Sequence, residues 1–147
     1  MFYSILRHAH SVNRWFVLIF LILSLVMAVI KMESKKEFSA FDRLSGTLTM
    51  SFTHLQLLLG IVLYFISGKV IFSVESFKND MLRFFLVEHV GLMLVAIALI
   101  TIGYSKIKKA ASSKMKRKRT VIYYGIALII ILLSLPWPWQ KLSAGWF

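Results

Sequence analysis

Long apolar runs separated by short polar segments organise the whole chain. Four runs are recognisable, and each is long enough, or nearly long enough, for a helix to cross the hydrocarbon core of a bilayer. They cover about residues 12–30, 46–66, 84–104 and 121–135. Because short connections favour antiparallel neighbours, the pattern predicts an all-α protein: an integral membrane, up-down four-helix bundle in a single domain, residues 1–147.

The composition agrees with a membrane protein and excludes several kinds of site. Of the 147 residues, 59% are hydrophobic, and the mean hydropathy is +0.76, which is higher than a soluble domain would show. The chain has no cysteine, so disulfides, thiolate metal sites, iron–sulfur clusters and covalently attached c-type haem are excluded. Any metal must therefore be bound by histidine, methionine or oxygen ligands.

The basic residues predict how the helices are oriented. The formal net charge is +12, and its placement beside apolar runs indicates membrane topology and contact with anionic lipid rather than nucleic acid binding. Of the 18 Lys and Arg residues, 12 lie in the connections after the first and third runs, and six lie on the other side. The positive-inside rule therefore puts both termini outside a bacterial inner (cytoplasmic) membrane, with the loop of residues 106–119 in the cytoplasm.

All four histidines lie in or just outside the first three runs. They are His8, His10, His54 and His89. Ionisable residues inside a membrane are costly and are commonly functional, so these histidines are the candidates for a site. His8 and His10 are about 200° apart on a helix, so at most one of them faces the bundle axis. Glu88 is expected either to satisfy its neighbour His89 or to pair with Arg14.

His10 and His89 are the candidate axial ligands of a haem. His10 has Arg14 one turn later and heads an apolar stripe; a b haem takes imidazoles from two helices, and its propionates pair with arginine. The runs put the two histidines about 10 Å apart along the membrane normal, which helix tilt absorbs in part. His54, nearer the bilayer centre, is therefore the substitute ligand. Each histidine is alternatively an interhelical hydrogen-bonding residue.

Three segments of the chain resemble a known family. They are His10-Ser11-Val12-Asn13-Arg14-Trp15, Phe52-Thr53-His54-Leu55-Gln56-Leu57-Leu58-Leu59-Gly60 and Glu88-His89-Val90-Gly91-Leu92-Met93. With the closing Pro136-Trp137-Pro138-Trp139, whose tryptophans suit a membrane interface, the chain resembles small four-helix membrane proteins of Bacteroidota-type bacteria that are labelled cytochrome b or b-type cytochrome-like. More remotely, it is similar to b-type four-helix cytochromes and to the copper-resistance D group. The resemblance implies a non-covalent haem b between histidines and electron transfer with quinone or a periplasmic partner.

The sequence supports three hypotheses about function. The leading one is a b-type membrane cytochrome that transfers electrons between the membrane quinone pool and a periplasmic or membrane partner, an electron-transfer protein rather than a free-standing enzyme. The second is a non-catalytic subunit or assembly factor of a larger envelope complex, or a homo-oligomer, whose histidines join helices by hydrogen bonds. The third is a metal or proton-coupled transporter, which the absence of proline within the runs disfavours.

Overall fold

Four long helices make up most of the described chain. The computed structural model describes residues 1–137, and within them it contains helices and connections but no strand. The elements are α1 (Phe2–Ile30), α2 (Ala40–Ile66), the 3₁₀ turn η1 (Glu75–Lys78), α3 (Asp80–Arg83), the π-helical η2 (Phe84–Glu88), α4 (His89–Lys108) and α5 (Ser113–Ser134). The prediction of an all-α protein is confirmed for this part of the chain.

The helices extend beyond the predicted apolar runs. α1 begins at Phe2 rather than near residue 12, and α5 begins at Ser113 rather than near residue 121. The expected loop of residues 106–119 is therefore mostly helical, and the connection itself is residues 109–112. Lysine and arginine are good helix formers, so a helix continues past the point where its apolar pattern stops. Ser112 caps α5, because its side chain accepts a hydrogen bond from the N–H of Met115 at 3.2 Å.

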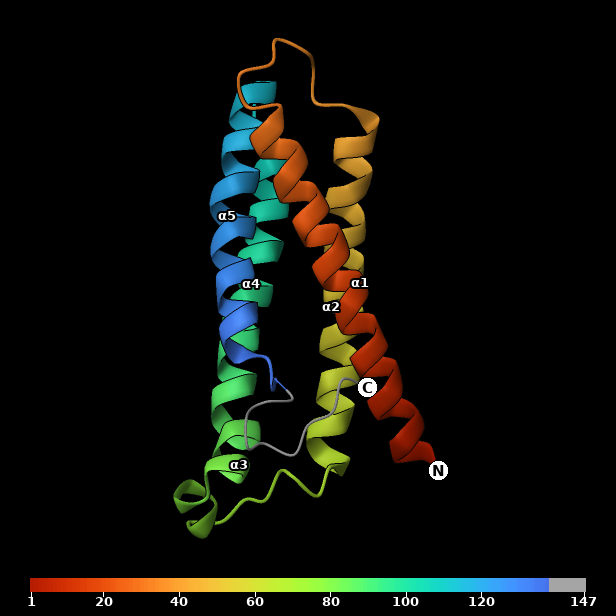
Figure 1. Ribbon diagram of the computed structural model, residues 1–147, viewed down its shortest axis with the longest axis vertical. Coiled ribbons are helices and arrows are strands. Elements are labelled where there is room, and N and C mark those ends of the chain that lie inside the picture. The colour runs from red at the N-terminus through yellow and green to blue at the C-terminus, as the bar shows by residue number, and fades with distance from the viewer. Residues whose placement is uncertain (138–147) are drawn as a thin grey trace.

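The long helices form two antiparallel hairpins that pack against each other (Figure 1). α1 packs on α2 and α4 packs on α5, and the hairpins meet where α1 contacts α5 and α2 contacts α4. α1 and α4 are consequently diagonal to each other. The two basic connections, residues 31–39 and 109–112, lie at the same end, uppermost in Figure 1, and the N-terminus lies at the other end.

Arg117 joins the two hairpins at the basic end. The residue is 1% exposed, and its guanidinium donates hydrogen bonds to the carbonyls of Ser34, Lys36 and Glu37 at 3.0, 2.6 and 3.1 Å. A planar guanidinium with several N–H groups can satisfy several carbonyls at once. The connection between α1 and α2 is therefore fixed to the first turns of α5.

Apolar side chains from α1, α4 and α5 form the core between the hairpins. Leu21, Ile100 and Ala127 are fully buried there. At Gly103, α4 comes so close to α5 that an added Cβ would lie 2.5 Å from the Cβ of Tyr123. Glycine is required at this position because any other side chain would push the two helices apart.

Three helical segments of the described chain are long and apolar enough to cross a membrane: Phe2–Ile30, Ala40–Ile66 and Asp80–Lys108. Many large apolar side chains on them face outward, including Phe65, which is 75% exposed. A continuous outward apolar surface suits contact with lipid. α5 does not qualify, because the basic residues 117–119 lie within it, and its crossing stays a prediction.

At the end of α5, Trp137 contacts the protein itself, and the placement of the tryptophans at a membrane interface stays a prediction. The Trp137 indole donates to the carbonyl of Leu132 at 3.0 Å, and the ring packs against the core. The Leu132 carbonyl lacks its usual helical donor because residue 136 is proline. Pro138 and Trp139 lie outside the described residues.

Replacing Arg117 by methionine should lower the free energy of unfolding by about 3 kcal/mol, because the three hydrogen bonds that the buried guanidinium donates to carbonyls are lost. The measurement is unfolding by increasing concentrations of a denaturing detergent, followed by circular dichroism. Lys118→Met, on the exposed side of the same turn, is the matched control and should change little. Equal effects of the two substitutions would contradict the anchoring role of Arg117.

Candidate functional site

His89 follows a segment of π-helix within the third long helical stretch. In Phe84–Glu88 the backbone hydrogen bonds skip one more residue than in an α-helix, and the N–H of His89 bonds the carbonyl of Phe84. Such segments are frequent at functional sites, since the extra residue changes the direction of the side chains that follow. The Leu86 carbonyl in this segment accepts a hydrogen bond from the hydroxyl of Tyr64 on α2 at 3.1 Å. The Phe84 ring packs beside the imidazole, with 5.7 Å between ring centroids.

The imidazole of His89 is oriented by the end of α5. Its Nδ1 lies 2.8 Å from the carbonyl oxygen of Ser134. Because a carbonyl accepts and cannot donate, Nδ1 carries the proton and Nε2 carries the lone pair. Metal-binding histidines commonly have this arrangement, with the non-ligating N–H donated to a backbone carbonyl. The Ser134 carbonyl is available because α5 ends at this residue, so the carbonyl has no helical donor.

His10 is fixed between α1 and α2 by its backbone and its ring. Gln56 donates a hydrogen bond from Nε2 to the His10 carbonyl at 3.0 Å and accepts one from Asn13 at 2.6 Å. The ring packs against Gly60, where an added Cβ would lie 3.4 Å from the imidazole. Nδ1 of His10 is buried and has no hydrogen-bond partner in the described chain. His8, two residues earlier, is exposed, as expected if one of the two faces the interior.

Contacts with α2 allow the heights of His10 and His89, that is, their positions along the bundle axis, to be compared. His10 contacts Gly60, and Leu86 is bonded to Tyr64. α2 and α4 run in opposite directions, so the step from Leu86 to His89 brings His89 to within about one turn of the height of Gly60. The two imidazoles are also close enough to interact electrostatically. Their separation in height is thus smaller than the 10 Å expected from the apolar runs.

Arg14 completes this group of residues. Its charge acts on both His10 and His89. The guanidinium lies over the ring of Trp15, 5.2 Å from the ring centroid, and the residue is half-buried. The structure therefore brings together three of the residues predicted to form one site, from two helices that are diagonal to each other.

His54 lies elsewhere. Its Nε2 is 3.2 Å from the hydroxyl of Thr101, and that hydroxyl donates to the carbonyl of Ile97 at 2.8 Å. The His54 Nε2–H is consequently the donor to Thr101. Thr101 is 12 residues beyond His89, about 18 Å along α4. The structure does not bring His54 and His89 together as a pair.

Glu88 does not take either of its expected partners. Its carboxylate pairs with Arg83 at 2.6 Å, on the exposed surface before α4. The residue that satisfies His89 is instead Ser134, through its backbone. Successive residues of a helix point about 100° apart, so Glu88 faces solvent while His89 faces α5.

Three residues that contact the candidate histidines had no role assigned from the sequence, and only one of them is marked by a sequence signal. Ser134 contributes a carbonyl, and prolines shortly after the end of a helix mark carbonyls that lack a helical donor. Gln56 lies in the second run, but its two partners on α1 depend on the pairing of helices. Thr101 carries no pattern that distinguishes it from an ordinary helical threonine.

In residues 1–137 no group of three or more His, Asp or Glu side chains is placed to hold a bare metal ion. A haem differs in this respect, because the porphyrin supplies four ligands and the protein needs to supply two. Comparisons of the chain with family models, with curated proteins and with solved structures found no match.

The arrangement of the histidines can be tested without any cofactor, since the chain has no native cysteine. A His10→Cys/His89→Cys pair should react with a short thiol-specific cross-linker in the folded protein, because the two side chains lie at nearly the same height. A His54→Cys/His89→Cys pair should not react, because these positions are about 18 Å apart along the helix axis. The cross-link is detected by gel mobility after tryptic cleavage. Reaction of the His54→Cys/His89→Cys pair without reaction of the His10→Cys/His89→Cys pair would contradict the geometry.

Proposed function

We propose that this chain is a b-type membrane cytochrome that transfers electrons between the membrane quinone pool and a periplasmic or membrane partner. The observation that carries the proposal is the pair of imidazoles, His10 and His89, at nearly the same height on diagonally opposite helices. Bis-imidazole ligation needs two such groups on opposite faces of a macrocycle.

The chemistry of the two rings supports this role. His89 donates its Nδ1–H to Ser134 and so keeps the Nε2 lone pair for a ligand. His10 has a buried ring nitrogen without a hydrogen-bond partner among the described residues. Buried polar atoms are nearly always satisfied, so such a nitrogen favours a bound group at this place.

Each surrounding residue has a defined task in this proposal. A bound b haem would supply one-electron chemistry at its iron. Arg14 supplies positive charge for a propionate, as arginine does for carboxylates in general. Gln56 and Asn13 hold the backbone of His10 in place, and the Phe84 ring shields the His89 imidazole from water.

The proposal also covers the membrane in which the chain lies and its orientation there. The chain would form a four-helix bundle in a bacterial inner membrane, with both termini outside and the basic end in the cytoplasm. Support comes from the two Lys- and Arg-rich connections, which lie at the same end of the structure. His10 and His89 lie at the other end and would therefore face the periplasmic side.

A second candidate function is supported by a specific contact. His54 and Thr101 form an interhelical hydrogen bond between α2 and α4, as Asn13 and Gln56 do between α1 and α2. Such bonds hold membrane helices together without any cofactor. If all the histidines act in this way, the chain is a non-catalytic subunit or assembly factor of a larger membrane complex.

Absorbance spectroscopy of the detergent-purified protein should separate the two candidates. The reduced wild-type protein should show Soret and α bands, which His10→Ala and His89→Ala should each abolish because bis-imidazole ligation is lost. His54→Ala and His8→Ala are the controls and should retain the bands. A wild-type protein without the bands, or four variants with unchanged spectra, would rule out the cytochrome and leave the structural role.

Fusions to a reporter that is active only outside the cytoplasmic membrane test the topology. A reporter inserted after Ser112 should be inactive, and one fused after Phe147 should be active, because 12 of the 18 basic residues lie on the Ser112 side. A paired reporter that fluoresces in the cytoplasm should give the complementary result. An inactive fusion at Phe147 would reverse the assignment and move the histidines to the cytoplasmic side.

A further inference from the structure

A cavity lies between the hairpins near the basic end, far from His10 and His89. Its volume is about 210 Å³, and residues of all four long helices line it. Ser24 of α1 is one of them, 14 residues or about 21 Å along the helix from His10. The cavity is therefore separate from the proposed cytochrome site, and binding of a ligand in it would not require haem.

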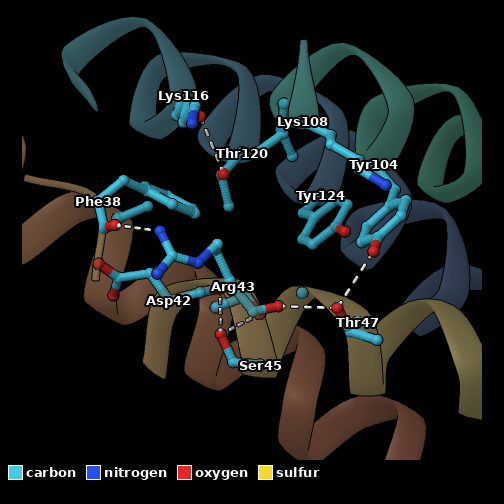
Figure 2. Close-up of a pocket in the computed structure, with 14 residues that line it drawn as sticks. Phe38, Asp42, Arg43, Ser45, Thr47, Tyr104, Lys108, Lys116, Thr120 and Tyr124 are labelled. Atoms are coloured by element: carbon cyan, nitrogen blue, oxygen red, sulfur yellow. Dashed lines mark hydrogen bonds between the residues drawn. The ribbon is translucent and has the colours of Figure 1, made fainter. Parts of the chain in front are cut away.

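Three cations line this cavity: Arg43, Lys108 and Lys116 (Figure 2). Asp42 also lines it, but the Asp42 carboxylate is paired with Lys31 at 2.9 Å. The negative charge in the lining is thus neutralised locally, and the cavity keeps a net positive charge. Such a site favours an anionic group.

The rest of the lining combines apolar side chains with hydroxyl groups. The hydroxyls of Thr47 and Tyr104 are hydrogen-bonded to each other at 3.1 Å (Figure 2). Tyr124 is 1% exposed, and its hydroxyl has no hydrogen-bond partner in the described chain. It faces Gly46, where an added Cβ would lie 3.7 Å from the phenol oxygen. A buried phenol normally finds an acceptor, so this hydroxyl points to a ligand with an acceptor oxygen.

We propose that the cavity binds an anionic glycerophospholipid. The phosphate lies among Arg43, Lys108 and Lys116, and an ester carbonyl of the glycerol backbone accepts a hydrogen bond from Tyr124. The acyl chains leave the cavity into the surrounding lipid. Basic pockets between helices on the cytoplasmic side of a membrane bind anionic headgroups in this manner.

The chemistry favours a lipid over the alternatives. Free phosphate can occupy the cationic part of the lining but leaves the Tyr124 hydroxyl unsatisfied and the apolar wall empty. A zwitterionic lipid brings its own ammonium group to a lining that already has three cations. A quinone supplies carbonyl acceptors for Tyr124 but no charge for the cations.

Native mass spectrometry of the full chain in detergent tests the proposal, with dioleoylphosphatidylglycerol, dioleoylphosphatidylcholine and inorganic phosphate as separate probes. Phosphatidylglycerol should bind most tightly. Arg43→Gln and Lys116→Gln should each weaken its binding by about fivefold, since one basic residue near an anionic lipid surface contributes on that scale. Tyr124→Phe should weaken it by a similar factor through the lost hydrogen bond, and its thermal stability without lipid should be unchanged or higher.

Lys118→Gln is the matched control, because Lys118 is exposed on the same helix and outside the cavity lining. It should leave phosphatidylglycerol binding unchanged. Equal weakening by Lys118→Gln and Arg43→Gln, with no effect of Tyr124→Phe, would mean general surface attraction and would overturn the proposal. Equal affinity for phosphatidylcholine, or binding of inorganic phosphate as tight as that of phosphatidylglycerol, would also overturn it.

Discussion

The buried guanidinium of Arg117 is the contact on which the register of the two hairpins depends. Within residues 1–137 it has no carboxylate partner and is satisfied by three backbone carbonyls of the connection between α1 and α2. That contact fixes one common height at the basic end. From there, α5 descends about 26 Å to Ser134, and α1 extends about 30 Å from Ile30 to His10. Ser134, which holds the His89 ring, and His10 therefore lie at a similar distance from the Arg117 contact and reach the same region of the bundle.

The polar groups of the interior gather at the two ends of the helices, and small hydroxyls join α1 to α2 at the basic end. Ser24 bonds Ser45 at 3.1 Å across α1 and α2, and Thr49 lies 3.4 Å from Ser24. Short side chains of this kind let membrane helices approach closely while satisfying each other's hydroxyls. Imidazoles and an arginine occupy one end, and cations with tyrosine hydroxyls occupy the other. Under the two proposals, the two ends would therefore bind different molecules without sharing a residue.

The sequence predicted the helices well and the contacts poorly, for physical reasons. Apolar runs predict where helices exist, because removing apolar side chains from water, into the core or into lipid, is the dominant energy. They do not predict the ends, since lysine and arginine continue a helix beyond the apolar pattern. Helical spacing correctly separated His8 from His10. The partners of His89 and Glu88 depended on a π-helical turn and on α5, neither of which leaves a periodic signal. The nearness of His10 and His89 likewise required the pairing of the hairpins.

The short apolar part of α5 has a consequence for the membrane itself. After Arg119 the helix continues only to Ser134, which corresponds to about 22 Å, whereas a typical hydrocarbon core is about 30 Å thick. In the proposed orientation, hydrophobic mismatch at this helix compresses the adjoining leaflet, while the longer α1 and α2 match the undistorted bilayer or tilt within it. The bilayer would thus be thinner beside α5 than beside α1 and α2. Its free energy in the membrane would depend on the acyl-chain length of the lipids beside α5.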